Sequence, residues 1–165
     1  MNTMLGGLFD QHRGAEQMLE RLAAATQRLR REGAQADVLK EFQGCREVLE
    51  GEVGSHFREE EQALFPVLGR HLGLEDGPIA AMMEEHARLR QLQLVYEGSL
   101  AALEYQHPGD WAESLQRAAE GILNLLPLHI AKEDEVLFPM AESMLGEAEW
   151  DECRTLWARS ALLIP

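Results

Sequence analysis

An eleven-residue motif that occurs twice constrains the fold of this chain more than any other sequence feature. Residues 56–66 read HFREEEQALFP and residues 129–139 read HIAKEDEVLFP, with five identical positions at an offset of 73. A shorter echo, DQH at 10–12 and EEH at 84–86, follows at an offset of 74. A duplicated structural unit explains both echoes, so we expect the two halves of the chain to form similar helical hairpins.

Four long segments carry apolar residues at alternating steps of three and four, the spacing of one buried helical face. They run over about 5–31, 36–65, 77–105 and 110–139. The connections REGAQAD, GRHLGLEDGP and QHPGD are short enough to join antiparallel neighbours. The predicted buried stripes include Glu52 in the second segment and Val136 in the fourth.

The sequence therefore predicts an all-α protein, an up-down antiparallel four-helix bundle with a short C-terminal fifth helix. We expect a single domain over residues 1–165, with the bundle at about 5–142 and the fifth helix at about 146–163. A chain of this length buries enough surface for one sizeable core.

Charge and hydropathy narrow the choice of partners. The formal net charge is -14, which repels a phosphate backbone or an anionic lipid surface, so we expect no nucleic-acid partner and no membrane partner. No apolar run approaches the roughly 18 residues that span a bilayer, and the first residues lack the pattern of a secretion signal. These features predict a cytoplasmic protein. Cys45 and Cys153 form no CxxC pair, which favours reduced thiols over a disulfide framework or a zinc–thiolate site.

Four histidines occupy the predicted apolar stripes, one on each long segment. The first loop lies about 21 residues after His12 and about 22 before His56, and at about 1.5 Å per residue this places both at one level. The second loop lies about 21 residues from both His86 and His129, so the second hairpin repeats the arrangement. Four imidazoles should therefore converge in one layer, joined by the two carboxylates at i+4, Glu60 and Glu133.

Imidazole and carboxylate groups on an apolar stripe cost several kcal/mol unless a partner inside the bundle compensates them. Hydrogen bonds within the core would satisfy a single histidine, but four at a common height with two glutamates indicate a metal. Iron, manganese and zinc all suit these donors, and carboxylates can bridge two ions, so the set predicts a dinuclear centre. We expect most other members of the acidic runs EEE at 59–61 and EDE at 133–135 to lie on a solvated face.

These residues resemble the motifs of the hemerythrin-like, or HHE cation-binding, domain family. The resemblance covers about residues 5–142 and rests on a lone histidine in the first helix, the doubled motif, and EHARLR at 85–90 in the third. It implies a non-haem centre of two iron ions, bridged by carboxylates and an oxo or hydroxo group, that meets O2, peroxide or NO. The ligands carried over by motif are His12, His56, Glu60, His86, His129 and Glu133.

Two positions differ from the pattern of the oxygen-carrying hemerythrins. The carriers have a second histidine one turn after that of the third helix, and Arg90 stands there in this chain. They take their last carboxylate from the position of Asp134, whereas bacterial domains commonly use i+4, which favours Glu133 here. The vacant coordination place would fall to water or to one of Glu16, Glu52 and Glu59.

The sequence leaves the role of the predicted centre open among several classes. The first interpretation is a di-iron protein that binds or senses O2, NO or peroxide, with a small diatomic ligand or peroxide as its partner. The alternatives are an enzyme that turns over peroxide or NO, an iron storage or delivery protein, and a metal-free helical interaction module. The oligomeric state is not predicted.

Overall fold

A computed structural model describes residues 3–161, and the described chain is built from helices. The elements are α1 (Thr3–Glu32), α2 (Ala36–Val48), η1 (Leu49–Val53), α3 (Gly54–Glu59), η2 (Glu60–Leu64), α4 (Phe65–Leu72), α5 (Gly77–Glu104), α6 (Trp111–Lys132), η3 (Glu133–Leu137), α7 (Phe138–Met144) and α8 (Glu147–Ala161). The elements named η are π-helical turns, wider than an α-helical turn.

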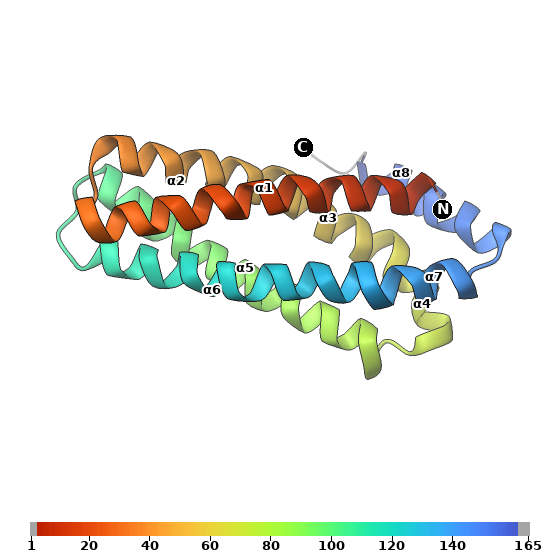
Figure 1. The fold of residues 1–165 in the computed structure, drawn as a ribbon. Coiled ribbons are helices and arrows are strands. Elements are labelled where there is room, and N and C mark those ends of the chain that lie inside the picture. The colour runs from red at the N-terminus through yellow and green to blue at the C-terminus, as the bar shows by residue number, and fades with distance from the viewer. Residues whose placement is uncertain (1–2, 162–165) are drawn as a thin grey trace.

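Together these elements form four long antiparallel bundle helices with α8 at one end (Figure 1). The first bundle helix is α1, the second runs without a break from α2 to α4, the third is α5, and the fourth runs from α6 to α7. The predicted all-α up-down bundle with a fifth helix is therefore confirmed. The fifth helix begins at Glu147, close to the predicted start, and the last two residues predicted for it lie outside the described residues.

Glycines with positive φ follow the first and second bundle helices. Gly33 follows α1 with φ 76°, and Gly73 follows α4 with φ 82°, a backbone region that side chains with a Cβ rarely adopt. Each glycine thus stops one bundle helix and turns the chain back along its neighbour.

The buried core consists of two apolar clusters with a polar layer between them. One cluster packs toward the α1–α2 and α5–α6 turns and includes Leu22, Phe42 and Tyr96. The other packs at the opposite end and includes Leu8, Phe65 and Phe138. The six candidate ligands lie between them and are all buried: His12, His56, Glu60, His86, His129 and Glu133.

Helix α8 closes the second cluster at the end of the bundle where α1 begins (Figure 1). Trp150 and Cys153 are buried there together with Leu145, and Trp157 packs at the edge of the cluster. Two polar contacts tie α8 to α4, one from Arg70 to Glu152 and one between His71 and Glu149. The fifth helix therefore covers the core on the far side of the polar layer.

The π-helical turns correct two predicted stripe positions. A π turn contains about one residue more than an α turn, so it advances the helical phase by one position. Glu52 was predicted to face the core, but it is exposed and Val53 is buried in its place. Val136 was predicted to face the core, but it is 51% exposed, whereas its neighbour Leu137 is 2% exposed.

The two π turns of the doubled motif fall at equivalent places and have an evident local cause. Both are followed directly by Phe–Pro, at 65–66 and 138–139. A proline lacks an amide hydrogen, and its ring crowds the carbonyl four residues earlier, which lies inside the π turn. A wider turn relieves this crowding, and in each copy of the motif the π turn begins at the buried glutamate, Glu60 or Glu133.

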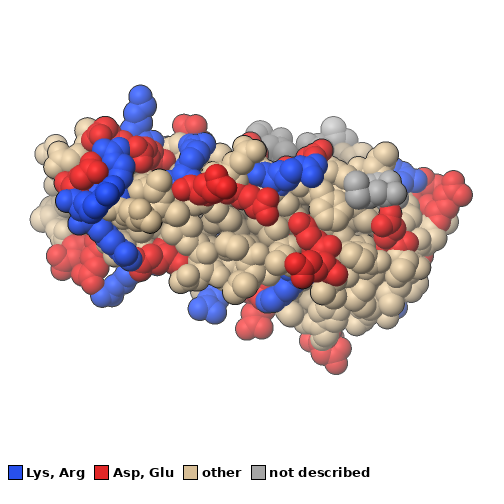
Figure 2. Space-filling view, in the orientation of Figure 1, with Lys and Arg blue, Asp and Glu red and all other residues tan. Residues whose placement is uncertain are grey.

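On the surface, acidic and basic side chains lie side by side, for example over the end of the bundle where α1 turns into α2 (Figure 2). There Arg28 contacts Glu32, Asp37 and Glu41. Among the described helices, we find none that combines the length and the apolar character needed to cross a membrane. Cys45 and Cys153 are free and buried, and burial raises the pKa of each thiol to about 11, which keeps both protonated.

Candidate metal centre

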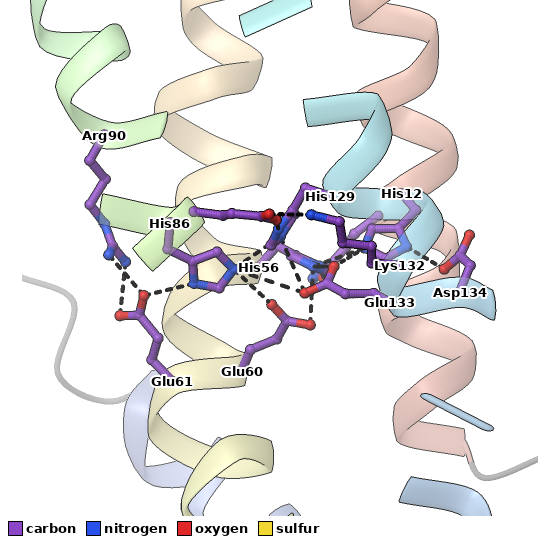
Figure 3. Close-up of polar contacts among 12 residues, drawn as sticks. His12, His56, Glu60, Glu61, His86, Arg90, His129, Lys132, Glu133 and Asp134 are labelled. Atoms are coloured by element: carbon purple, nitrogen blue, oxygen red, sulfur yellow. Dashed lines mark hydrogen bonds and ion pairs between the residues drawn. The ribbon is translucent and has the colours of Figure 1, made fainter. Parts of the chain in front are cut away.

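The four bundle helices each contribute one histidine to the polar layer, and the imidazole rings turn toward one another (Figure 3). The Nε2 atoms of His12 and His56 lie 3.0 Å apart. The Nε2 atoms of His86 and His129 lie 3.1 Å apart. The predicted convergence at one level therefore occurs, and it produces two histidine pairs, one from each hairpin.

Glu133 reaches both histidine pairs. Its Oε2 lies 3.1 Å from His12 Nε2, and its Oε1 lies 3.2 Å from His129 Nε2. The carboxylate therefore spans the space between the pairs, one oxygen toward each.

Glu60 spans the same space from the second bundle helix. Its Oε1 lies 3.4 Å from His56 Nε2, and its Oε2 lies 3.3 Å from His86 Nε2. The two glutamates come from equivalent positions of the doubled motif, and each faces one histidine of either pair. This is the placement of a carboxylate that bridges two cations.

The four oxygen atoms of Glu60 and Glu133 are buried and accept no hydrogen bond, although imidazole nitrogens lie close to them. A buried carboxylate without such partners costs several kcal/mol. Two clusters of donor atoms in the described chain have the spacing that a cation needs: Glu60, His86, His129 and Glu133, and then His12, His56 and Glu133. The donors present thus fit two metal ions with nitrogen and oxygen ligands.

Without a metal, opposite charges compensate one another inside the layer. Burial would lower the pKa of His56, but the carboxylates of Glu60 and Glu133 outweigh it and raise the pKa to about 10. Burial would also lower the pKa of His86, and contacts with Glu60 and Glu61 raise it instead. Burial would raise the pKa of Glu133, yet contacts with the imidazoles of His12, His129 and His56 hold it well below its usual range. Protons on the imidazoles therefore take the place that cations would occupy.

Each ring is oriented by a hydrogen bond at its outer nitrogen, Nδ1. The partner of His12 is Asp134 at 2.6 Å and the partner of His56 is Gln11 at 2.8 Å. In the other hairpin, His86 contacts Glu61 at 2.8 Å and His129 contacts Glu85 at 3.0 Å. With Nδ1 engaged, Nε2 of every ring faces the interior, where a metal ligand must be.

These outer partners form a closed ring around the bundle. Each is the immediate sequence neighbour of an inner residue, and each contacts the histidine of the next bundle helix. Gln11 of α1 contacts His56 of α3, and Glu61 of η2 contacts His86 of α5. Glu85 of α5 contacts His129 of α6, and Asp134 of η3 contacts His12 of α1. The sequence reading missed the roles of Gln11, Glu61 and Glu85, although their positions beside His12, Glu60 and His86 were the available signal.

Arg90 points away from the inner layer and pairs with Glu61 through two contacts of 2.8 and 2.9 Å (Figure 3). Its guanidinium also lies over the ring of Phe57. Burial would raise the pKa of Glu61, but its contacts with His86 and Arg90 lower it to about 2, so this carboxylate is ionised. Glu61 is therefore a member of the acidic runs that does not lie on a solvated face, while Glu135 is exposed, as expected for most members.

None of the additional ligands considered from the sequence joins the inner layer of the described chain. Glu16 and Glu52 are exposed. Glu59 accepts hydrogen bonds from Gln11 and Ser55, and Asp134 contacts the outer nitrogen of His12. The inner layer thus consists of four histidines and two glutamates, with Glu133 rather than Asp134 between the pairs.

The chain matches one family model and several curated proteins. A family model described as the hemerythrin HHE cation-binding domain matches residues 3–141. Relatives from Enterobacter sp. (strain 638), Escherichia coli O1:K1 / APEC and Escherichia fergusonii, each named iron-sulfur cluster repair protein YtfE, are 32% identical over 136 residues. The match covers 80% of this chain and 60% of each relative, so the chain spans about 60% of the length of these curated relatives. Among solved structures, none matches the chain significantly.

Proposed function

The chain belongs to the hemerythrin HHE cation-binding domain family, and from that membership we propose that it is a non-haem di-iron protein. Its proposed ligands are His12, His56, Glu60, His86, His129 and Glu133. The observation that carries the proposal is the set of four buried carboxylate oxygens that accept no hydrogen bond, surrounded by four inward-facing imidazole nitrogens. Manganese and zinc suit the same donors, and the family resemblance favours iron.

When bound, the two iron ions supply electrons and open coordination positions to a small oxidant such as O2, NO or peroxide. The residues of the chain provide the setting for that chemistry. Glu60 and Glu133 place negative charge between the two positions, and the outer hydrogen-bond partners hold the imidazoles in one orientation. The apolar clusters on either side of the layer keep bulk water away.

A small cavity beside the histidine layer supports a small molecule, and not a large one, as the ligand of the proposed centre. It measures about 10 Å³, room for one water-sized molecule, and its walls include His12, His56 and His129. Ala15 and Phe57 supply apolar surface on its other sides. A molecule of about the size of water fits this space, whereas an organic substrate does not.

Metal analysis of protein made under iron-replete, anaerobic conditions tests the proposal. We expect about two iron ions per chain, one for each histidine pair. Addition of NO, O2 or peroxide to the reduced protein should then change the optical spectrum of the iron. A preparation that stays folded with only trace metal would overturn the di-iron proposal. Repeated turnover of excess peroxide or NO would identify an enzyme rather than a binding or sensing protein.

A second candidate function is iron supply to iron–sulfur clusters. The curated relatives are named iron-sulfur cluster repair proteins, and this chain shares 32% identity with them. We propose that the loaded chain delivers iron to the metal-free form of a small iron–sulfur protein when sulfide is present. Recovery of the cluster absorbance, in competition with a ferrous chelator that blocks recovery from free iron, would support delivery. Recovery no better than from free iron would contradict it.

A further inference from the structure

The outer ring of hydrogen bonds treats the two histidine pairs differently. At the His86/His129 pair, both outer nitrogens contact carboxylates, Glu61 and Glu85. Each of these carboxylates is also held by a basic side chain, Glu61 by Arg90 and Glu85 by Lys132. Figure 3 shows Arg90 beside Glu61 on the outer side of His86.

At the His12/His56 pair, only one of the two outer contacts is to a carboxylate. His12 contacts a carboxylate, Asp134, but His56 contacts the neutral amide of Gln11. The amide of Gln11 in turn donates to Glu59, 2.9 Å away. On the outer side of the layer, the nearest carboxylate is therefore one residue further from His56 than from the other three histidines.

The internal repeat identifies Gln11 as the exception. Gln11 corresponds to Glu85 at the offset of 74 that relates His12 to His86. Glu59 corresponds to Lys132 at the offset of 73 that relates His56 to His129. In the second half of the molecule the carboxylate of Glu85 pairs with the cation of Lys132. At the equivalent positions of the first half, the neutral amide of Gln11 donates to the carboxylate of Glu59.

The inner donors show the same inequality. Four donor groups gather within metal-binding distance around the His86/His129 pair: the two imidazoles, Glu60 and Glu133. Among the described residues, three donor groups that all lie close to one another gather around the other pair, His12, His56 and Glu133, and Glu60 Oε1 lies 3.4 Å from His56 Nε2 as well. The His86/His129 position thus combines the more compact group of inner donors with more anionic outer contacts.

An outer carboxylate makes an imidazole a stronger ligand, because it stabilises the positive charge that the ring shares with the metal. Arg90 and Lys132 oppose a metal charge, but they lie one residue further out and are 43% and 51% exposed, so solvent screens them. The direct contacts at Nδ1 therefore decide the difference between the two positions.

We propose that the two metal positions retain their ions unequally, and that Gln11 makes the His12/His56 position the one that releases its ion first. This inference rests on the proposed function and extends it, because a releasable ion beside a retained one suits a protein that hands on iron. Gln11 acts as a positioning and tuning residue through His56 and touches no metal itself.

The decisive variant exchanges the two outer side chains, Q11E together with E59Q. The net charge stays the same, and the hydrogen-bond chain from Ser55 through residue 59 to residue 11 and His56 is preserved. The exchange only moves the negative charge into contact with His56. The measurement is the release of Fe²⁺ from the anaerobic, iron-loaded protein to an excess of a coloured ferrous chelator.

For the natural sequence we expect two release phases of equal amplitude, one ion each. In the exchange variant the fast phase should slow by about tenfold, the usual size of such outer contacts, while the slow phase stays unchanged. A merely damaged structure would speed release, so slower release separates tuning from disruption. As the matched control, E85Q should speed only the slow phase, because Glu85 serves His129, and this variant also keeps the test open if the exchange variant does not fold.

Two outcomes overturn the inference. One is release of both ions in a single phase by a protein that binds two, which leaves the di-iron proposal intact. The other is an exchange variant or E85Q that alters both phases alike. A folded protein that binds no iron contradicts the proposed function itself and the inference with it.

Discussion

His12 and His56 face each other through their Nε2 atoms at 3.0 Å. Two imidazole nitrogens at this distance can hold only one proton between them, so one ring must donate while the other accepts. The raised pKa of His56, at about 10, identifies it as the ring that keeps its second proton in the metal-free protein. The metal-free layer is thus an ion-paired network whose stability depends on pH.

The first prediction concerns the metal-free protein between pH 6 and 10. The pKa of His56 is raised in the fold from 6.5 to about 10, so its stabilising effect is complete below pH 6.5 and is lost as pH rises toward 10. The loss of stability therefore falls in the pH interval between these two pKa values. We therefore expect the melting temperature of the chelator-treated protein to fall steadily from pH 7 to 10.

The matched comparison uses two histidine variants. H56Q should flatten this pH dependence, because the titrating ring is gone, whereas H107Q should keep it, because His107 is exposed and far from the layer in sequence. A metal-free protein whose stability is constant from pH 7 to 10 would contradict the charged network. Below pH 5 the sign reverses, because Glu133 has a lowered pKa and its contribution is lost as the carboxylate gains a proton.

A second prediction separates inner from outer acidic residues of the fourth bundle helix. E133Q keeps the shape of the side chain but removes the charge that faces His12 and His129. We expect bound iron to fall from about two ions per chain to one or fewer. E135Q, two residues further along on the exposed face, should leave the metal content unchanged. Equal metal content in both variants, measured by elemental analysis, would remove Glu133 from the ligand set.

A third prediction tests the helical phase after the π turn at Glu133–Leu137. Leu137 is buried in the second apolar cluster, and Val136 is half exposed. L137A should cost about 2–5 kcal/mol of unfolding free energy, as truncations of buried leucine do. V136A should change it by less than about 0.5 kcal/mol. Denaturant titration of both variants gives the answer, and the reverse order would restore the regular α-helical phase expected from the sequence.

The helical phase after the π turns could not be predicted from the sequence, and the reason is physical. Apolar spacing averages over a whole helix and identifies its buried face, which is why the bundle and the convergence of four histidines were predictable. A π turn changes the phase by one residue through a local hydrogen-bond choice, and the resulting pairs, Glu52 with Val53 and Val136 with Leu137, both contain an apolar candidate. The Phe–Pro at 138–139 was the local signal for the π turn at Glu133–Leu137, whereas no such pair follows the π turn at Leu49–Val53.

The outer ring was missed for a different reason. Glu61 belonged to an acidic run expected mostly on a solvated face, and Glu85 received no role, because a charge pattern along one helix does not reveal a contact with the next helix. Only the packed bundle brings Glu61 against His86 and Glu85 against His129. The identity of Glu60 and Glu133 as inner residues needed no such information, since each lies one turn from a histidine on its own helix.

The cytoplasmic location and the lack of nucleic-acid and membrane partners stay predictions.

The last prediction follows from Arg90. In the oxygen-carrying hemerythrins, to which this chain shows a resemblance, a further histidine at this position completes the ligands of one iron. Here the side chain turns outward to Glu61 and contributes a cation to the outer ring, so the inner layer keeps six donors. With fewer protein ligands, each bound iron would keep a coordination place for a small oxidant, which favours electron transfer over reversible binding.

We therefore expect the reduced, iron-loaded protein to be oxidised by O2 or peroxide and not to return O2 when the gas is pumped away. Optical spectra through repeated oxygenation and evacuation measure this directly, and R90H, which restores the imidazole of the carriers, is the informative variant. If R90H gains partial recovery of the reduced spectrum while R90K does not, the missing imidazole is the cause. Full and repeated recovery by the natural sequence would instead make the protein an oxygen carrier with a smaller ligand set.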